Sequence, residues 1–259
     1  QTGVTDIGYV APAYVSDKMP LSGVVELPGL FDTSCKGSRA SWKLIKAGIL
    51  GKEDFEKNRV KALFAFTLVP FQVFTSKRGK IDSMGSLQGL KIRAAGGSIP
   101  LALKSLGMVP INMSAPEIRE SLSRGTIDGS VGPFSSVKPY GLHELVQYGT
   151  SGAGFGSFLV TYSIGDEKWN RLPANVQDAM ARAGEETVEH FCAFADADEA
   201  KARDGLVQGG LKLYHFSAAD LAAINQGLAP VRDDWASKLI SRGLPASEAL
   251  AAFQKALEN

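Results

Sequence analysis

The stretch Gly89-Leu-Lys-Ile-Arg-Ala-Ala-Gly-Gly97 decides the fold and indicates an anion site at the end of a strand. Leu90–Ile92 is typical of a buried strand, and Arg93 follows it at the mouth of a glycine-rich turn. In open α/β sheets, ligands bind outside the carboxyl ends of the strands. An arginine at that position presents a rigid, permanently charged fork that matches a carboxylate or a phosphate.

A second stretch, Arg124-Gly-Thr-Ile-Asp-Gly-Ser-Val-Gly-Pro-Phe134, predicts another strand end. Arg124-Gly125 is typical of the end of a helix, and Asp128-Gly129 is typical of a turn. The short strand Ile127–Val131 then leads into a loop. The two stretches together predict an anion site between strand ends.

Predicted strands and helices alternate along the chain, which indicates parallel α/β sheets. Between them lie glycines and prolines that end helices or begin them. The predicted strands are Ile7–Val10, Lys61–Val69, Phe71–Thr75, Leu90–Ile92, Val109–Met113, Ile127–Val131, Phe158–Tyr162 and Leu211–His215. The predicted helices, apart from one long helix, are Ser38–Gly48, Asp54–Arg59, Pro100–Leu106, Ala115–Ser123, Ala219–Lys238 with Pro230 as a kink or break, and Pro245–Leu257.

The segment from Pro173 to about Gly205 predicts one unusually long helix. Apolar residues recur in it at steps of three and four, which places them on one helical face. At 1.5 Å per residue such a helix is ~48 Å long, enough to span two domains. The alternative is two helices, broken near Gly184 or near Asp196-Ala-Asp198.

Composition excludes several classes of protein. The chain has 259 residues and a formal net charge of +1, so no global charge favours nucleic acid or an anionic membrane. No apolar run approaches the ~18 residues of a transmembrane helix. We expect no nucleic-acid partner, and we expect a monomer.

The two cysteines, Cys35 and Cys192, lie too far apart in the sequence for a metal-binding pattern. In an oxidising compartment they could pair and close a long loop. The sequence does not show whether their Cα atoms are close enough for that bond. We expect two separate thiols, with the disulfide as the alternative.

Catalytic patterns are not found. His143, His190 and His215 have no neighbours at metal-ligand spacing, and neither a nucleophile elbow nor a phosphate-binding loop occurs. Gly152-Ala-Gly-Phe-Gly156 falls short of a dinucleotide fingerprint and predicts a hinge-like loop. We therefore expect no catalytic residue, no metal and no cofactor. One interpretation is an enzyme that uses Arg93 to orient an acid. No acid–base pair accompanies this arginine, which speaks against it.

The two stretches also resemble a known family, the solute-binding subunits of tripartite ATP-independent periplasmic (TRAP) transporters, of the DctP-like type. Further segments occur in the family's order and spacing over nearly the whole chain. They are Asp6–Tyr14, Glu26–Phe31, Phe74–Lys77 and Trp169–Pro173.

The resemblance implies an α/β, two-lobe periplasmic binding protein fold with an interlobe cleft, hinge crossings and a long helix spanning both lobes. From the same resemblance we expect the family's first strand, first helix and second strand to be missing from the sequence before Gln1.

The resemblance also implies boundaries and site residues. Lobe I would hold 1–70 and 158–197, and lobe II would hold 71–157 and 198–259. Arg93 would grip the substrate carboxylate; the alternative is a surface arginine paired with Asp82 or Glu117. Gly132 stands where many relatives carry asparagine, and Gln72 where sialic-acid-binding relatives carry a second arginine. The other predicted ligand-binding residues are Ala11, Pro12, Tyr14, Pro133, Phe134, Phe155 and Ser157, of which Phe134 could instead be core and the last two could lie in a flexible loop.

The resulting hypothesis is a periplasmic solute-binding protein that captures a small organic acid and delivers it to a membrane permease. Candidates include C4-dicarboxylates, 2-oxoacids, hydroxy or sugar acids, and aromatic acids. A neutral Gln72 and the glycine at 132 favour a ligand with one carboxylate. The alternative is a binding protein or sensor domain of another system that uses the same fold.

Overall fold

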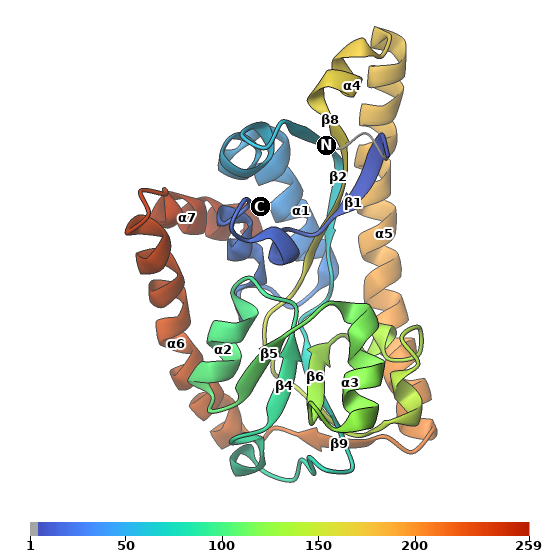
Figure 1. Cartoon of the computed structure of the whole chain (residues 1–259), viewed down its shortest axis with the longest axis vertical. Helices are drawn as coiled ribbons and strands as arrows, with labels where there is room; N and C mark the ends of the chain where they lie inside the picture. Colours follow the sequence, from blue (N-terminus) through green and yellow to red (C-terminus); the bar gives the residue numbers. More distant parts are fainter. Residues whose placement is uncertain (1–4, 259) are drawn as a thin grey trace.

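Two β-sheets organise the chain, one in each lobe. The structure, a computed structural model, describes residues 5–258 (Figure 1). One sheet has three strands in the order β1-β8-β2, and the other has six in the order β5-β4-β6-β3-β7-β9. The strands are β1 (Ile7–Val10), β2 (Val60–Thr67), β3 (Gln72–Ser76), β4 (Lys91–Ala94), β5 (Val109–Asn112), β6 (Gly129–Gly132), β7 (Val146–Ser151), β8 (Leu159–Gly165) and β9 (Lys212–His215).

The helices cover these sheets and connect the lobes. The helices α1 and α5 both pack on β2 of the small sheet, and α2 packs on β4 and β5 of the large one. None of the helices within residues 5–258 combines the length and apolar character needed to cross a membrane. The helices are α1 (Ser34–Ala47), α2 (Ile99–Ser105), α3 (Ile118–Arg124), α4 (Asp166–Arg171), α5 (Ala174–Gln208), α6 (Ala218–Ile240) and α7 (Ala246–Leu257), and short 3₁₀ turns include η1 (Pro12–Val15), η2 (Leu21–Glu26) and η6 (Phe134–Ser136).

The long helix is confirmed as one element, α5, of 35 residues. It runs beside both lobes in Figure 1. Gly184 does not break it but lets it approach the small sheet, since a Cβ there would lie 2.0 Å from the carbonyl oxygen of Leu63. Phe191 packs nearby on Phe66, with ring centroids 3.8 Å apart. Close packing on β2 therefore keeps the helix continuous past its glycine.

The prediction of parallel sheets is wrong for the small sheet and only partly right for the large one. β8 is antiparallel to both β1 and β2, and β3 is antiparallel to both β6 and β7. Parallel pairs join β4 to β5 and β6, and β7 to β9. Alternating elements predict parallel pairing when neighbouring strands follow one another through a helix. Here β8 returns from the other lobe and runs in the opposite direction.

The prediction of two separate thiols is also wrong. Cys35 and Cys192 form a disulfide that joins the first turn of α1 to the middle of α5, with Cα atoms 4.6 Å apart. The bond closes a loop across 157 positions of the sequence. Only the packing of α1 on α5 brings the two cysteines together, and no local pattern reports that packing.

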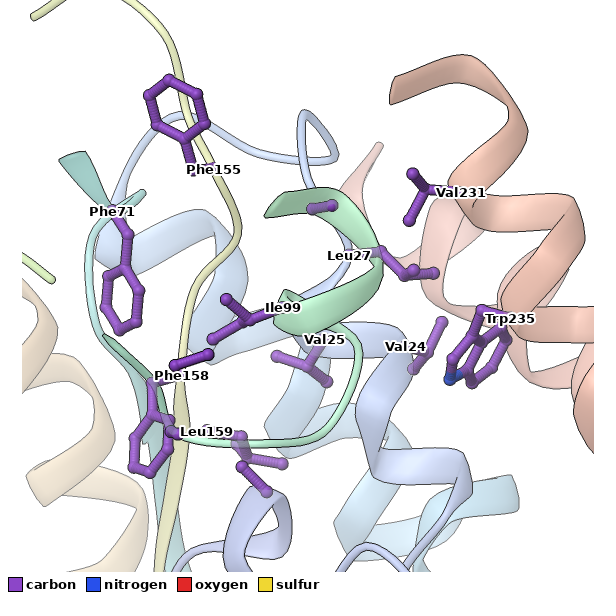
Figure 2. Close-up of a cluster of buried hydrophobic side chains, with 14 of the residues drawn as sticks. Val24, Val25, Leu27, Phe71, Ile99, Phe155, Phe158, Leu159, Val231 and Trp235 are labelled. Atoms are coloured by element: carbon purple, nitrogen blue, oxygen red, sulfur yellow. The ribbon is translucent and has the colours of Figure 1, made fainter. Parts of the chain in front are cut away.

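Two extended segments cross between the lobes, and they are hydrogen-bonded to each other. The N–H of Leu68 donates to the carbonyl of Phe158 at 2.9 Å. The N–H of Phe71 donates to the carbonyl of Gly156 at 2.8 Å, and the carbonyl of Phe71 accepts the N–H of Phe155 at 3.0 Å. Figure 2 shows the rings of Phe71, Phe155 and Phe158 along these crossings, beside a core that includes η2 and α6. These paired crossings and α5 connect the two lobes, and the passage from α6 to α7 is a further connection.

The predicted lobe boundaries remain a prediction, and one contact bears on them. The C-terminal helix α7 packs against α1 and η2, which lie within 1–70. We therefore propose that α7 moves with the first lobe, although it belongs to the segment 198–259.

A buried carboxyl joins η2 to the glycine-rich turn after Arg93. Glu26 is fully buried, and its Oε2 accepts the N–H of Ser98 at 3.3 Å. Its Oε1 has no hydrogen-bond partner within the described part of the chain. Gly97 has φ +62°, and a Cβ there would lie 1.8 Å from Oε2. The glycine therefore allows the turn to close over this carboxyl.

Burial raises the pKa of Glu26 to about 8, and the Ser98 N–H opposes the shift only in part. The native state therefore keeps the proton up to about pH 8, while the unfolded chain releases it near its usual value of 4.5. Since the native state binds more protons in this window, stability falls as pH rises from about 4.5 to 8 and then levels off.

Replacing Glu26 with glutamine should remove this loss. The unfolding free energy of Glu26→Gln, relative to the wild type, should increase from pH 5 to pH 8 by at most about 1.4 kcal/mol per pH unit. Urea unfolding of both proteins at the two pH values measures this change. The contributions of the other titrating groups are the same in both proteins, so they cancel when the two unfolding free energies are subtracted. An equal difference at both pH values would mean that Glu26 ionises normally in the native state.

Candidate functional site

Arg93 occupies the third position of β4, where the strand approaches the opposite lobe. Only 5% of the residue is exposed. Its Nε–H donates to the carbonyl of Met113 at 3.0 Å, just beyond β5. Its Nη2 donates to the hydroxyl of Tyr14 at 3.2 Å, and Tyr14 belongs to η1 of the first lobe. The guanidinium is thus held between the lobes.

No carboxylate of the described chain forms an ion pair with this buried cation, although hydrogen bonds from Ser114 and, to a lesser degree, the charge of Arg93 lower the pKa of Glu117. Asp82 instead pairs with Lys80, and Glu117 accepts the N–H of Ser114 at 2.8 Å. A guanidinium carries five N–H donors, and the two bonds above are the ones that residues 5–258 provide. Burying a charge without a counter-charge is costly. The remaining N–H donors of this guanidinium are therefore able to bind an anion.

A cavity of about 90 Å³ adjoins Arg93, with walls that are mainly apolar and aromatic. Its residues come from β1, η1, β3, β4, α3, β6, the crossing segments, the turn at Ala115 and the loop after β6. Among the described residues that line it, Arg93 is the one charged side chain. The lining residues are Tyr9, Tyr14, Leu68, Phe71, Phe74, Arg93, Ala115, Ile118, Ser130, Val131, Gly132, Pro133, Ser136, Val137, Tyr140, Leu142 and Phe158.

Four residues predicted from the sequence lie together at this cavity: Arg93, Tyr14, Gly132 and Pro133. Tyr14 packs its ring on Phe158, with centroids 5.4 Å apart, while its hydroxyl reaches the guanidinium. Gly132 ends β6, and a Cβ there would meet no atom within 4 Å. The cavity therefore has open space beside this position.

The other predicted residues lie outside the lining of the cavity. Gln72 turns toward the crossing 152–158, where its amide donates to the carbonyl of Ala153 and accepts from the hydroxyl of Thr150. Ser157 donates to the carbonyl of Leu68 at 2.6 Å. Phe134 packs edge-on against Phe74 in the core of the second lobe, with centroids 5.0 Å apart. The remaining three, Ala11, Pro12 and Phe155, are buried in packing contacts.

Several lining residues were not predicted. Leu68, Phe71 and Phe158 flank the crossing segments, so the strand ends around positions 67–72 and 158 were the signal that could have identified them. Tyr9 also lines the cavity and is 53% exposed. Tyr140 follows a loop with no recognisable pattern, and we find no signal for it.

The chain matches one protein family over most of its length. Residues 1–238 match the family described as "Bacterial extracellular solute-binding protein, family 7". The C4-dicarboxylate-binding periplasmic protein DctP of Rhodobacter capsulatus is 27% identical over 167 residues, which are 63% of this chain and 50% of that protein. The chain thus spans about half the length of this relative.

Two solved structures share the fold over nearly the whole chain. A TRAP periplasmic solute-binding protein from Bordetella bronchiseptica, with bound (R)- and (S)-mandelate, is 27% identical with a TM-score of 0.87, covering 99% of this chain and 81% of that chain. A marine metagenome TRAP solute-binding protein specific for aromatic acid ligands, in complex with metahydroxyphenylacetate, has a TM-score of 0.90 at 24% identity, covering 99% and 80%. Both confirm the two-lobe fold.

Proposed function

Because the chain belongs to bacterial extracellular solute-binding protein family 7, we propose that it captures a small organic acid with one carboxylate at Arg93. The protein is periplasmic, as its family indicates. It delivers the acid to the membrane subunits of a TRAP-type permease and catalyses no reaction. Its partners are therefore a small ligand and a membrane protein.

The single observation that supports the proposal is the buried guanidinium of Arg93, which has no carboxylate partner within the described chain. A ligand carboxylate would supply the missing charge and accept the free N–H groups in a bidentate contact. Because the contact is desolvated, it is stronger than an exposed ion pair.

The cavity walls favour a ligand whose remaining part is apolar or aromatic. Phe71, Phe74 and Phe158 line the cavity, and no second cation among the described residues does. The two solved structures described above contain bound aromatic acids, which is consistent with such walls. The cavity of about 90 Å³ is smaller than the roughly 150 Å³ of a cavity that holds benzene. An aromatic acid therefore requires the lobes to stand further apart than in this structure, and the ligand favours the lobe arrangement that it binds more tightly.

Thermal unfolding of the full-length protein against a ligand panel tests the proposal. The panel contains benzoate, mandelate and pyruvate as monocarboxylates, succinate as a dicarboxylate, and benzyl alcohol as a neutral ring. A ligand at a thousand times its Kd adds about 4 kcal/mol to stability and should raise Tm by on the order of 10 °C. We expect a monocarboxylate to give the largest shift and benzyl alcohol to give none. A shift with benzyl alcohol equal to that with benzoate would contradict carboxylate capture.

A further inference from the structure

One wall of the Arg93 cavity is a single short segment of chain. Gly132, Pro133, Ser136, Val137 and Tyr140 all line the cavity and all lie within nine consecutive positions. The segment leaves β6 and begins with the 3₁₀ turn η6. Backbone hydrogen bonds from Ser136 to Pro133 and from Val137 to Phe134 close its turns, and Phe134 and Val137 are buried in the core of the second lobe. The first N–H groups of a helix have no acceptor inside it, so those of Phe134 and Ser135 need an acceptor from another element.

A carboxylate on α5 binds the first two N–H groups of this turn. Oε1 of Glu199 accepts the N–H of Phe134 at 2.7 Å, and Oε2 accepts the N–H of Ser135 at 2.9 Å. Burial raises the pKa of Glu199, and these hydrogen bonds oppose the shift by stabilising the charged form. Bonds to an ionised acceptor are roughly twice as strong as neutral ones. Glu199 thus holds the start of the wall with both oxygens.

One turn earlier on α5, a second carboxylate binds two backbone N–H groups in the same way, at the start of α1 in the first lobe. Asp196 accepts the N–H groups of Ser34 and Cys35 at 2.6 and 3.2 Å, at the start of α1. The adjoining disulfide, Cys35–Cys192, fixes α1 to the same part of α5. α1 contributes no residue to the Arg93 cavity, whereas the segment held by Glu199 forms one of its walls.

We propose that Glu199 is a positioning residue for the ligand cavity, holding the wall 132–140 in place from the long helix. This inference rests on the proposed function, since it assumes that the cavity binds an organic acid. Without the carboxylate, two N–H groups lose their acceptor and the wall samples other positions. The ligand must then order the wall when it binds, which lowers its affinity.

The two carboxylates provide a matched pair of variants. Glu199→Gln keeps the shape and one acceptor oxygen but turns an NH₂ group toward a backbone N–H. Asp196→Asn makes the same change one turn away, at α1. We expect both variants to lower Tm by similar amounts. Glu199→Gln should weaken the binding of benzoate and (R)-mandelate at least tenfold in calorimetric titration, whereas Asp196→Asn should leave Kd within twofold of the wild type.

A ligand-free measurement separates this inference from the proposed function. Amide hydrogen exchange over residues 132–140 should become faster in Glu199→Gln and stay unchanged in Asp196→Asn. If the wild type binds neither probe, the ligand class is wrong and the exchange result alone decides the role of Glu199. Unchanged exchange in Glu199→Gln would overturn the proposal. Equal losses of affinity in both variants would also overturn it, because Glu199 would then be merely structural.

Discussion

Replacing Arg93 with methionine should abolish most of the affinity for an organic acid. Removing one partner of a buried, hydrogen-bonded charge pair costs about 2–5 kcal/mol, which is a loss of roughly thirtyfold to several thousandfold in Kd. The loss is large because the ligand carboxylate would enter a cavity whose described lining has no other positive charge. Calorimetric titration with the acid that gives the largest thermal shift measures it.

The same substitution should not weaken the ligand-free protein. Arg93 is buried and lacks an ion pair within residues 5–258, so methionine removes an uncompensated charge and keeps much of the volume. The bonds to Met113 and Tyr14 are lost, which offsets part of the gain. We expect a Tm equal to or above that of the wild type.

Lys91→Met is the control, because Lys91 is exposed on the same strand and does not line the cavity. It should leave Kd unchanged. Equal affinity in Arg93→Met and the wild type would mean that the carboxylate binds elsewhere.

Removing the disulfide should cause the largest loss of stability. Cys35 and Cys192 close a loop across 157 positions, and the chain-entropy relation gives about 5 kcal/mol for a loop of that length. For a chain of this size, that corresponds to a decrease in Tm on the order of 10 °C or more. Thermal unfolding of the double variant Cys35→Ala/Cys192→Ala, compared with the wild type without reductant, measures the effect.

The ion pair between Arg39 and Glu189 offers a control at the same helix interface. It joins α1 to α5 at 2.6 Å, but both side chains are more than half exposed. Such pairs contribute about 0–1 kcal/mol, so Arg39→Ala should change Tm only slightly. Thiol titration of the unfolded, unreduced wild type should find no free cysteine. Two reactive thiols would show that the bond does not form, and an unchanged Tm in the double variant would show that it does not stabilise the fold.

The parts of the site that follow from local sequence could be predicted. Arg93 was identified because an apolar strand and a glycine-rich turn surround it, and both depend on neighbouring residues alone. The long helix was predicted for the same reason, since its apolar residues recur at helical spacing whatever elements it packs against. Gly132 and Pro133 were predicted through the family resemblance of the segment that contains them, and the structure places both at the cavity.

The parts that depend on distant contacts could not be predicted. Gln72 lies on a correctly predicted strand, but the crossing 152–158 determines which way its amide turns. Cys35 and Cys192 meet only because α1 packs on α5. Glu199 lies 65 positions from the N–H group of Phe134 that it binds, and nothing near either residue predicts that contact. The predicted direction of β8 was wrong for the same reason, since the chain enters β8 on its return from the other lobe.

The most direct test of carboxylate capture is a crystal structure of the full-length protein with the acid that gives the largest thermal shift. We predict one carboxylate in contact with the Arg93 guanidinium, with N···O distances of about 2.7–2.9 Å, and the rest of the ligand against Phe71, Phe74 and Phe158. An acid bound at another place, with Arg93 still lacking a counter-charge, would contradict the account.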